Sequence, residues 1–282
     1  MSTAVSFHEF CERAYDRFHR PDYIAPDPLE VVREYPMASD REVVGLIASS
    51  LALGRVDGIV SASREVVDLL CDRRTAPCSP ATAILSLEPD EIARVCTGFR
   101  YRFFDSDQMA GLLIGIRAVL LEYGSLEEGF AAGLGSGGVL AGLERLVESL
   151  VAGAGGRLDR SILLARPDRG SACKRLLLYL RWMVRSDAID PGGWTAVGPE
   201  ALLVPVDTHV LRLARRLGLT GRSQASLRVS QEITDAFRAI SPDDPVRYDF
   251  CLTRPGIHPL LDEQQFIEQR VHTTGAIFAT LG

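Results

Sequence analysis

The sequence lacks the cysteine and histidine patterns that mark many metal centres. None of its six cysteines forms a CxxC pair, and only Cys251 follows Asp207, which excludes a four-cysteine zinc or iron–sulfur site in the C-terminal third. His258 and His272 form a wide pair without metal-ligand spacing. We therefore expect no bound metal. The cysteines are expected to be free thiols buried in the core, at positions Cys11, Cys71, Cys78, Cys96, Cys173 and Cys251.

Long hydrophobic runs and an excess of basic residues are also absent. No stretch of about 18 uninterrupted apolar residues occurs, and the N-terminal segment carries acids where a signal peptide has a basic and then an apolar region. The net charge of −6 argues against a surface that is basic throughout and binds nucleic acid indiscriminately. We expect a cytoplasmic monomer that makes no membrane contact.

Clear alternation of apolar and polar residues, which indicates half-buried strands, is missing as well. Gly133, Gly135 and Gly138 spell G-x-G-x-x-G, but no strand precedes them, so we interpret this segment as a loop between helices. Apolar residues instead recur at three- and four-residue steps. These segments are 42–54, 56–70, 110–124, 139–153, 173–185, 208–219 and 229–240. The sequence therefore predicts an all-α fold.

One helix carries an unusual group of cations. Residues 171–222 contain eight Lys and Arg against four Asp and Glu, so a site for an acidic ligand is best sought there. At about 100° per residue, Lys174, Arg181 and Arg185 fall within about 40° of one another on the helix 173–185. The pattern fits either a solvated face of an amphipathic helix or a binding stripe that starts at Lys174.

Lys174 and Asp207 are candidates for chemistry. The positive end of the helix dipole, the adjacent Arg175 and desolvation all disfavour the charged form of the Lys174 amine, which would favour a Schiff-base nucleophile. In PVDTHVLRLARRLG, Pro205 keeps the chain extended and Asp207 or Thr208 caps the next helix. Capping alone would account for Asp207, and activation of the lysine is the alternative role.

The segments SACKRLLLYLRWMVR and PVDTHVLRLARRLGLTGR, followed by SPDDPVRYDFCLTRPGI, are similar to an uncharacterised bacterial family. That family resembles a distant branch of the helix-hairpin-helix DNA glycosylase superfamily. EVVGLIASSLALGRVDGI is similar to the helix that opens the glycosylase core. The resemblance covers most of the chain. It implies one unit, 1–282, with helical lobes at 30–165 and 166–282, the segment 1–29 on the second lobe, and the site between the lobes.

The resemblance also implies a reaction. In bifunctional members of the superfamily, a lysine attacks the sugar C1′ of a damaged nucleotide and an aspartate activates the amine. Lys174 and Asp207 match these positions. They lie 33 residues apart, farther than in endonuclease III-type enzymes and similar to archaeal 8-oxoguanine DNA glycosylase. The expected activity is DNA N-glycosylase and apurinic-site lyase, with no metal or organic cofactor.

Further residues receive roles from the same resemblance. A flipped base would need stacking surfaces, for which Trp182, Trp194 and His209 are candidates, although large apolar residues more often belong to the core. The expected partner is DNA, with RNA as an alternative. Its phosphates would need cations and exposed amides. The candidate phosphate contacts are Gly170, Ser171, Arg175, Arg181, Arg185 and Arg212.

The sequence departs from the glycosylase pattern at the hairpin. ARPDRGSACK keeps only Gly170 as a turn glycine, and SSLALGR lacks the glutamine that many relatives carry near the pocket. Two alternatives therefore stay open. One is a catalytically silent nucleic-acid-binding module of the same fold, and the other is a Schiff-base enzyme that acts on a small carbonyl compound.

Overall fold

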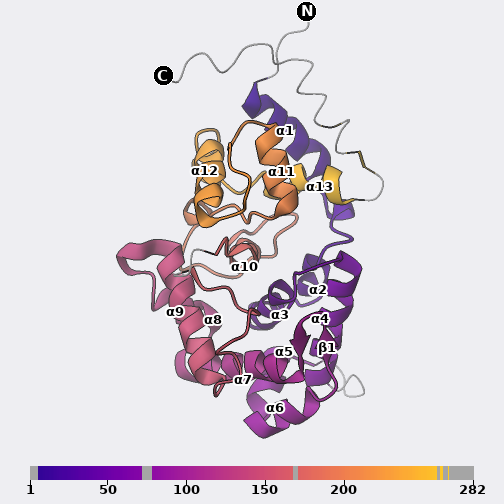
Figure 1. The fold of residues 1–282 in the computed structure, drawn as a ribbon, viewed down its shortest axis with the longest axis vertical. Coiled ribbons are helices and arrows are strands. Elements are labelled where there is room, and N and C mark those ends of the chain that lie inside the picture. The colour runs from indigo at the N-terminus through magenta and orange to yellow at the C-terminus, as the bar shows by residue number, and fades with distance from the viewer. Residues whose placement is uncertain (1–5, 72–77, 168–170, 259–260, 263–265, 267–282) are drawn as a thin grey trace, which may run out of the picture.

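The protein is built mainly of helices (Figure 1). The computed structural model describes residues 6–71, 78–167, 171–258, 261–262 and 266. The α-helices are α1 (Phe7–Phe18), α2 (Leu29–Arg33), α3 (Ala38–Ser50), α4 (Val56–Leu70), α5 (Pro80–Ser86), α6 (Pro89–Val95), α7 (Ser106–Tyr123), α8 (Leu126–Ala131), α9 (Gly138–Gly153), α10 (Lys174–Val184), α11 (Thr208–Arg216), α12 (Leu227–Arg238) and α13 (Asp249–Ile257). The 3-10 turns η1 (Pro21–Tyr23), η2 (Gly135–Gly137) and η4 (Pro199–Ala201) join some of them.

The helical class predicted from the sequence is confirmed. Each segment with a three- to four-residue apolar period overlaps an observed α-helix. The sequence missed a small antiparallel hairpin of β1 (Arg100–Tyr101) and β2 (Phe104–Asp105). Strands of two residues are too short to show the alternation by which strands are recognised.

Helix α10 lies between two groups of helices, with α1, α11, α12 and α13 above it and α3 to α8 below it in Figure 1. It packs against α3, while α1 and α11 pack against α13. Glycine permits the close approach of α3 and α10, because a Cβ at Gly45 would lie only 3.1 Å from the terminal methyl carbon of Met183. Most of α10 is therefore part of the core, including Tyr179, Trp182 and Met183.

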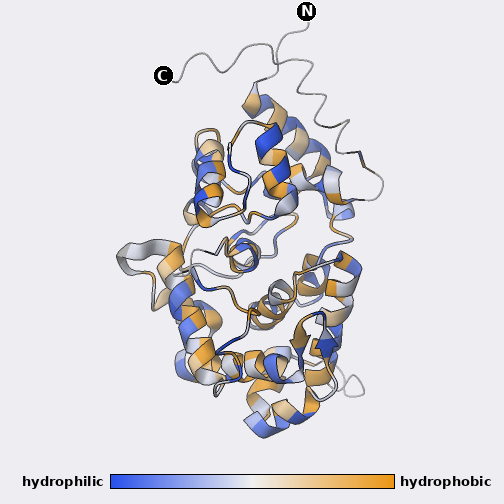
Figure 2. Cartoon of the chain, in the orientation of Figure 1, coloured by the Kyte–Doolittle hydropathy of each residue, from blue (hydrophilic) through white to orange (hydrophobic). Residues whose placement is uncertain are grey.

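The distribution of hydrophobic residues agrees with this packing. In Figure 2, α4, α7 and α12 carry both hydrophobic and hydrophilic residues along their lengths, as expected of amphipathic helices that turn one side to a core. Within the described ranges, no helix combines the length and apolar character that a membrane span requires.

Two of the cysteines differ from expectation. Cys71 and Cys78 form a disulfide, so the prediction that they are free thiols was wrong. Their Cα atoms lie 5.7 Å apart, within the range that a disulfide can bridge. No sequence motif indicates such a local pair. The four other cysteines are buried thiols outside any disulfide, as predicted: Cys11, Cys96, Cys173 and Cys251.

Candidate functional site

The structure brings the two predicted catalytic residues together. Lys174 is the first residue of α10, and Asp207 immediately precedes α11. The Lys174 Nζ atom lies 3.6 Å from Asp207 Oδ2, and the two side chains are 28% and 30% exposed. The pair is therefore close enough for a proton to pass with a small movement, and it is open to a ligand.

Asp207 performs two tasks with its two oxygens. Its Oδ1 accepts hydrogen bonds from the backbone amides of His209, at 2.8 Å, and Val210, at 2.9 Å. These are N-cap bonds, which explain why α11 begins where it does. Oδ2 is the oxygen that faces Lys174. The capping role is thus observed, and it holds the second oxygen of the carboxylate beside the amine.

The backbone immediately before Lys174 is strained. Cys173 has φ of 49°, a left-handed conformation that is rare for a residue with a side chain, and the residue is buried. Its amide donates to Ser171 Oγ at 3.3 Å, so the hydroxyl of Ser171 shapes the turn that leads into α10. Strain of this kind persists where surrounding structure enforces it, and it often occurs beside functional residues.

Lys174 is also the only lysine in the chain, in which the other 30 Lys and Arg residues are all arginine. An arginine stays charged in a protein, whereas a lysine amine can lose its proton and become a nucleophile. Sequence reasoning missed this compositional signal. Lys174, the one lysine, faces the Asp207 carboxylate, and both residues line an open cavity.

The cavity has a volume of about 440 Å³. The start of α4 lines it on one side, through Arg55 and Ile59, and α10, α11 and α13 line it on the other. The two groups of helices between which α10 lies therefore both contribute side chains to the cavity. Lys174, Asp207 and His209 all face it. A cavity of this size is within the usual range for small-molecule sites.

His209, a predicted base-pocket residue, lines the cavity, and Arg212, a predicted phosphate contact, lies beside it. Arg212 Nη2 lies 3.1 Å from His209 Nδ1. A guanidinium can only donate, so His209 Nδ1 is the acceptor in this contact. Arg212 itself is exposed on α11.

Arg181 was expected to contact phosphate, and the structure corrects this. The side chain is 4% exposed and its guanidinium contacts Asp249 and Asp190. Burial by itself would lower the pKa of Arg181, but the two carboxylates outweigh that effect and raise the pKa above its ordinary value. Arg181 and Asp249 lie at the cavity wall as a neutral pair. Arg254 and Asp27 form a second such pair, at 2.8 Å.

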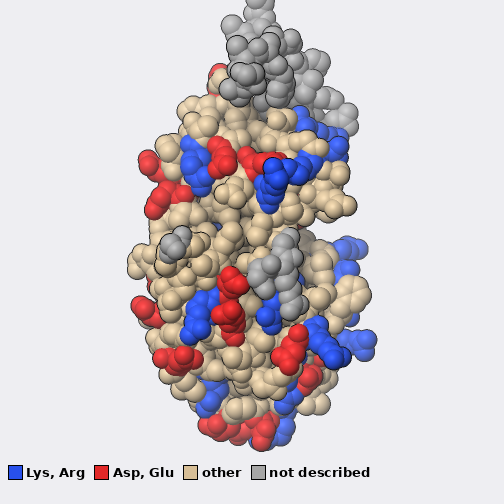
Figure 3. Space-filling view, turned by 60° about the vertical axis from the view of Figure 1, so that its left-hand side comes forward, with Lys and Arg blue, Asp and Glu red and all other residues tan. Residues whose placement is uncertain are grey.

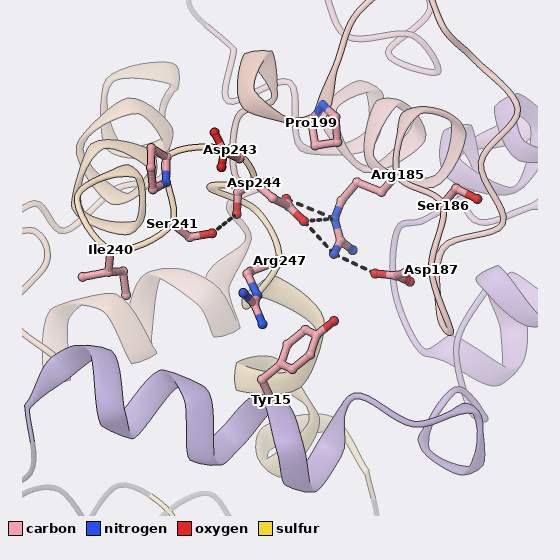
Figure 4. Close-up of a pocket in the computed structure, with 11 residues that line it drawn as sticks. Tyr15, Arg185, Ser186, Asp187, Pro199, Ile240, Ser241, Asp243, Asp244 and Arg247 are labelled. Atoms are coloured by element: carbon pink, nitrogen blue, oxygen red, sulfur yellow. Dashed lines mark hydrogen bonds and ion pairs between the residues drawn. The ribbon is translucent and has the colours of Figure 1, made fainter.

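Arg185 is corrected for the same reason. It follows the last residue of α10 beside a second cavity of about 550 Å³, shown in Figure 4. Its guanidinium contacts Asp187, Asp190 and Asp244, and its side chain is 4% exposed. Apart from Lys174, the expected cationic stripe of α10 is therefore an internal ion-pair network, because carboxylates from later segments cover it.

Arg175 also has an internal role. Its Nη1 donates to the carbonyl of Ser50 at 2.6 Å, its Nη2 donates to the carbonyl of Ile162, and the guanidinium lies 5.7 Å from the ring centre of Phe104. Burial lowers the pKa of Arg175. These bonds tie the start of α10 to neighbouring segments, and they engage the guanidinium that was predicted to contact phosphate. Gly170, another predicted contact, lies outside the described residues.

The two tryptophans belong to the core and do not line the cavity, which corrects their predicted role as a base pocket. Trp182 is fully buried and Trp194 is 5% exposed. The Trp194 ring packs against Phe130 and Tyr179, and its indole nitrogen donates to Glu42 at 3.2 Å. The core alternative, based on the general burial of large apolar residues, was the correct one.

Comparison with known families gives one match. The model of the family described as "Protein of unknown function (DUF2400)" matches residues 27–258. The chain belongs to this family. No curated protein matches the chain, and no solved structure does. The DUF2400 match contains the lining of the Lys174 cavity except Pro26, together with helices α2 to α13, and it leaves α1 outside.

Sequence reasoning did not identify the remaining polar residues of the cavity. In this DUF2400 protein Asp27 precedes α2, Arg55 precedes α4, and Asp249 and Arg254 lie on α13. Each of these residues lies near a helix end or in a short helix, and no regular spacing in the sequence relates one of them to another. Among the described residues, no group of three His, Cys, Asp or Glu side chains is placed to hold a metal ion.

Proposed function

We propose that this protein is a DNA N-glycosylase with apurinic-site lyase activity. Lys174 is the nucleophile and Asp207 is the residue that accepts its proton. The observation that carries the proposal is the position of the only lysine in the chain, 3.6 Å from a carboxylate in an open cavity. The resemblance to DNA glycosylases in the segments around both residues supports the choice of substrate.

The reaction balances with the groups present. Asp207 takes a proton from the Lys174 ammonium, and the free amine attacks C1′ of the nucleotide. The bond between C1′ and the base breaks, and its electron pair leaves with the base, which takes up a proton. The nitrogen then passes a second proton to O4′ as the C1′–O4′ bond breaks, which opens the sugar ring and forms the protonated imine. Loss of a C2′ proton then expels the 3′ phosphate and cuts the strand.

The surroundings of the pair suit this chemistry. The buried pairs Arg181–Asp249 and Arg254–Asp27 leave the cavity wall close to neutral, so Lys174 and Asp207 face a ligand without a competing net charge from those residues. The Asp207 carboxylate is held by its cap bonds, and preorganised charges stabilise a cationic sugar more effectively than mobile ones.

Borohydride trapping tests the proposal. Duplexes that carry an abasic site or 8-oxoguanine are incubated with the protein and borohydride, which reduces an imine to a stable secondary amine. We expect an adduct with the wild type and none with Lys174→Arg, which keeps the positive charge but cannot supply the nucleophile. Asp207→Asn should slow the adduct by about 10²-fold or more.

Because Lys174 is the only lysine, the Lys174→Arg variant is a clear control for this test. A Lys174→Arg variant contains no lysine, so any remaining adduct would have to come from the α-amino group of the chain. Duplex binding without an adduct in the wild type would contradict the proposal and indicate a silent binding module. An adduct with glyceraldehyde, but with neither DNA substrate, would assign the same pair to a small carbonyl compound.

A further inference from the structure

The tip of the β1–β2 hairpin presents an exposed aromatic ring beside the Lys174 cavity. Phe103 is 69% exposed, the largest exposed fraction among the large hydrophobic residues that the structure describes. We propose that the Phe103 ring stacks on an unpaired base next to the nucleotide that enters the cavity, so that single-stranded nucleic acid is bound in preference to a duplex. This inference rests on the proposed function, because it assumes that the substrate is a nucleic acid.

Contacts of the hairpin place its tip at the rim of the cavity, beside α4 (Figure 1). Gly54 lines the cavity, and a Cβ at this position would lie only 3.0 Å from Cζ of Arg102. The Tyr101 hydroxyl donates to the carbonyl of Leu53 at 2.9 Å. The Tyr101 ring lies against α4, because a Cβ at Gly58 would be 3.3 Å from its edge. The hairpin is therefore anchored to the segment that forms one side of the cavity mouth.

The turn of the hairpin is strained in a way that displays Phe103. Tyr101 pairs with Phe104, so Arg102 and Phe103 form the two-residue turn. Arg102 has φ of 53°, at a turn position where glycine is favoured. Among the described residues other than glycine, only Arg102 and Cys173 have a positive φ, and both lie beside the Lys174 cavity. Phe104 is fully buried, so two adjacent phenylalanines have opposite environments and only Phe103 is available to a ligand.

Two arginines accompany the exposed ring. The Arg102 guanidinium lies 5.7 Å from the centre of the Phe103 ring. Arg55 lines the cavity, and its side chain is 91% exposed. Arg55 contacts Asp57 at 3.7 Å, but an ion pair this exposed contributes little and can yield to a phosphate. Proteins that bind single strands combine cations for the backbone with aromatic rings on which bases stack, and the cavity rim has this composition.

A duplex fits the molecule less well than a single strand. Each base of a duplex is covered by its neighbours, so a base can stack on Phe103 only after it has been unstacked, which costs free energy. Arg181 and Arg185, which were expected to contact DNA phosphates, are bound to carboxylates instead. On the face shown in Figure 3, basic and acidic side chains are interspersed. Stacking needs fewer phosphate contacts than duplex binding, and it therefore suits this acidic protein.

Exposure alone does not distinguish Phe103, because single exposed hydrophobic residues are normal on protein surfaces. Leu121 on α7 is 61% exposed and does not line the Lys174 cavity. What distinguishes Phe103 is its position on a strained turn at the cavity rim, next to two cations. Leu121 is therefore a matched control, with similar exposure and no link to the cavity.

The test compares the binding of single-stranded and duplex DNA by fluorescence anisotropy. The labelled oligonucleotide carries a tetrahydrofuran abasic analogue, which lacks the C1′ leaving group and cannot form an imine. Binding is thus measured without chemistry. The variants are Phe103→Ala, which removes the ring, Phe103→Trp, which keeps an aromatic ring, and Leu121→Ala as the control.

We expect the wild type to bind the single strand at least about 10-fold more tightly than the duplex, because the duplex has to be opened first. Phe103→Ala should raise the Kd for the single strand by about 5- to 150-fold, the range that corresponds to the loss of one stacked base. Phe103→Trp and Leu121→Ala should bind as the wild type does.

Three outcomes would overturn the inference: tighter binding of the duplex, no binding of the single strand by the wild type, or equal losses in Phe103→Ala and Leu121→Ala. The result is distinct from that of the trapping test. Binding that depends on Phe103 without any wild-type adduct keeps the stacking contact and removes the enzyme. An adduct together with binding that is indifferent to Phe103→Ala does the reverse.

Discussion

The two ends of α10 hold cations in opposite ways. At the first residue, Lys174 faces one carboxylate at 3.6 Å, and both side chains are almost a third exposed. Just past the last residue, Arg185 faces three carboxylates and is almost completely buried. The first cation is an amine that lines an open cavity, whereas the second is a guanidinium that stays charged and is enclosed by carboxylates. The comparison shows that solvent access and the number of partners, rather than the sign of the charge, separate a candidate catalytic cation from a structural one.

The largest expected effect concerns Arg185, at the buried end of α10. Arg185→Ala leaves Asp190, which is fully buried, with one arginine fewer, and removes a partner of Asp187 and Asp244. Loss of one partner of a buried network costs about 3–5 kcal/mol. We expect the free energy of unfolding, measured by urea denaturation, to fall by that amount.

Lys174→Ala is the matched control for this measurement. A partly exposed ion pair contributes about 0–1 kcal/mol, so the free energy of unfolding should fall by no more than about 1 kcal/mol. Equal losses in Lys174→Ala and Arg185→Ala would show that the two ends of α10 do not differ as the structure indicates.

The middle of α10 supplies a prediction of intermediate size. The Tyr179 hydroxyl donates to the backbone carbonyl of Glu42. The side chain of Glu42 accepts three further hydrogen bonds at Oε2, from the backbone amides of Leu126 and Glu127 and from the indole nitrogen of Trp194. Burial raises the pKa of Glu42 to about 7, although those hydrogen bonds oppose the shift. The folded state therefore binds this proton more tightly than the unfolded state, whose carboxyl has a pKa near ~4.3.

The raised pKa of Glu42 makes the free energy of unfolding depend on pH. Between the two pKa values the folded state holds more protons, so the Glu42 contribution to stability is present at low pH and is lost as the pH rises toward about 7. Glu42→Gln keeps an acceptor for the three donors and removes the titration. Relative to this variant, the wild type should lose on the order of 3 kcal/mol between about pH 5 and about pH 8. Parallel urea midpoints of the two proteins at both pH values would contradict the assignment.

The smallest expected effect concerns Asp207, which faces Lys174 at the exposed end of α10. Asp207→Ala removes the N-cap of α11 and should cost about 1 kcal/mol, whereas Asp207→Asn keeps a capping oxygen and should cost only a few tenths of a kcal/mol. Both should slow imine trapping, because neither can accept the Lys174 proton. Trapping by Asp207→Asn at the wild-type rate would limit Asp207 to capping.

Seven of the helices and the N-cap of α11 were accessible to sequence reasoning, and the environments of the polar faces of the helices were not. The period of 173–185 placed Lys174 and Arg181 on one side of α10, and both line the same cavity, whereas Arg185 lies just past the end of the helix. It did not show that Asp249 and Asp244, more than fifty residues later, cover two of them. A helical period gives the direction of a side chain but contains no information about distant segments that pack against it.

The sequence by itself determined the helical class, the N-cap of α11 and the single lysine at the start of α10, because local periodicity, capping and composition depend on neighbouring residues or on none. Tertiary structure alone decided that Oδ2 of Asp207 faces Lys174 and that Arg181 and Arg185 are buried and neutralised. Those outcomes depend on the packing of α10, α11 and α13 around one cavity. Burial and the count of opposite charges then determine which cation can react.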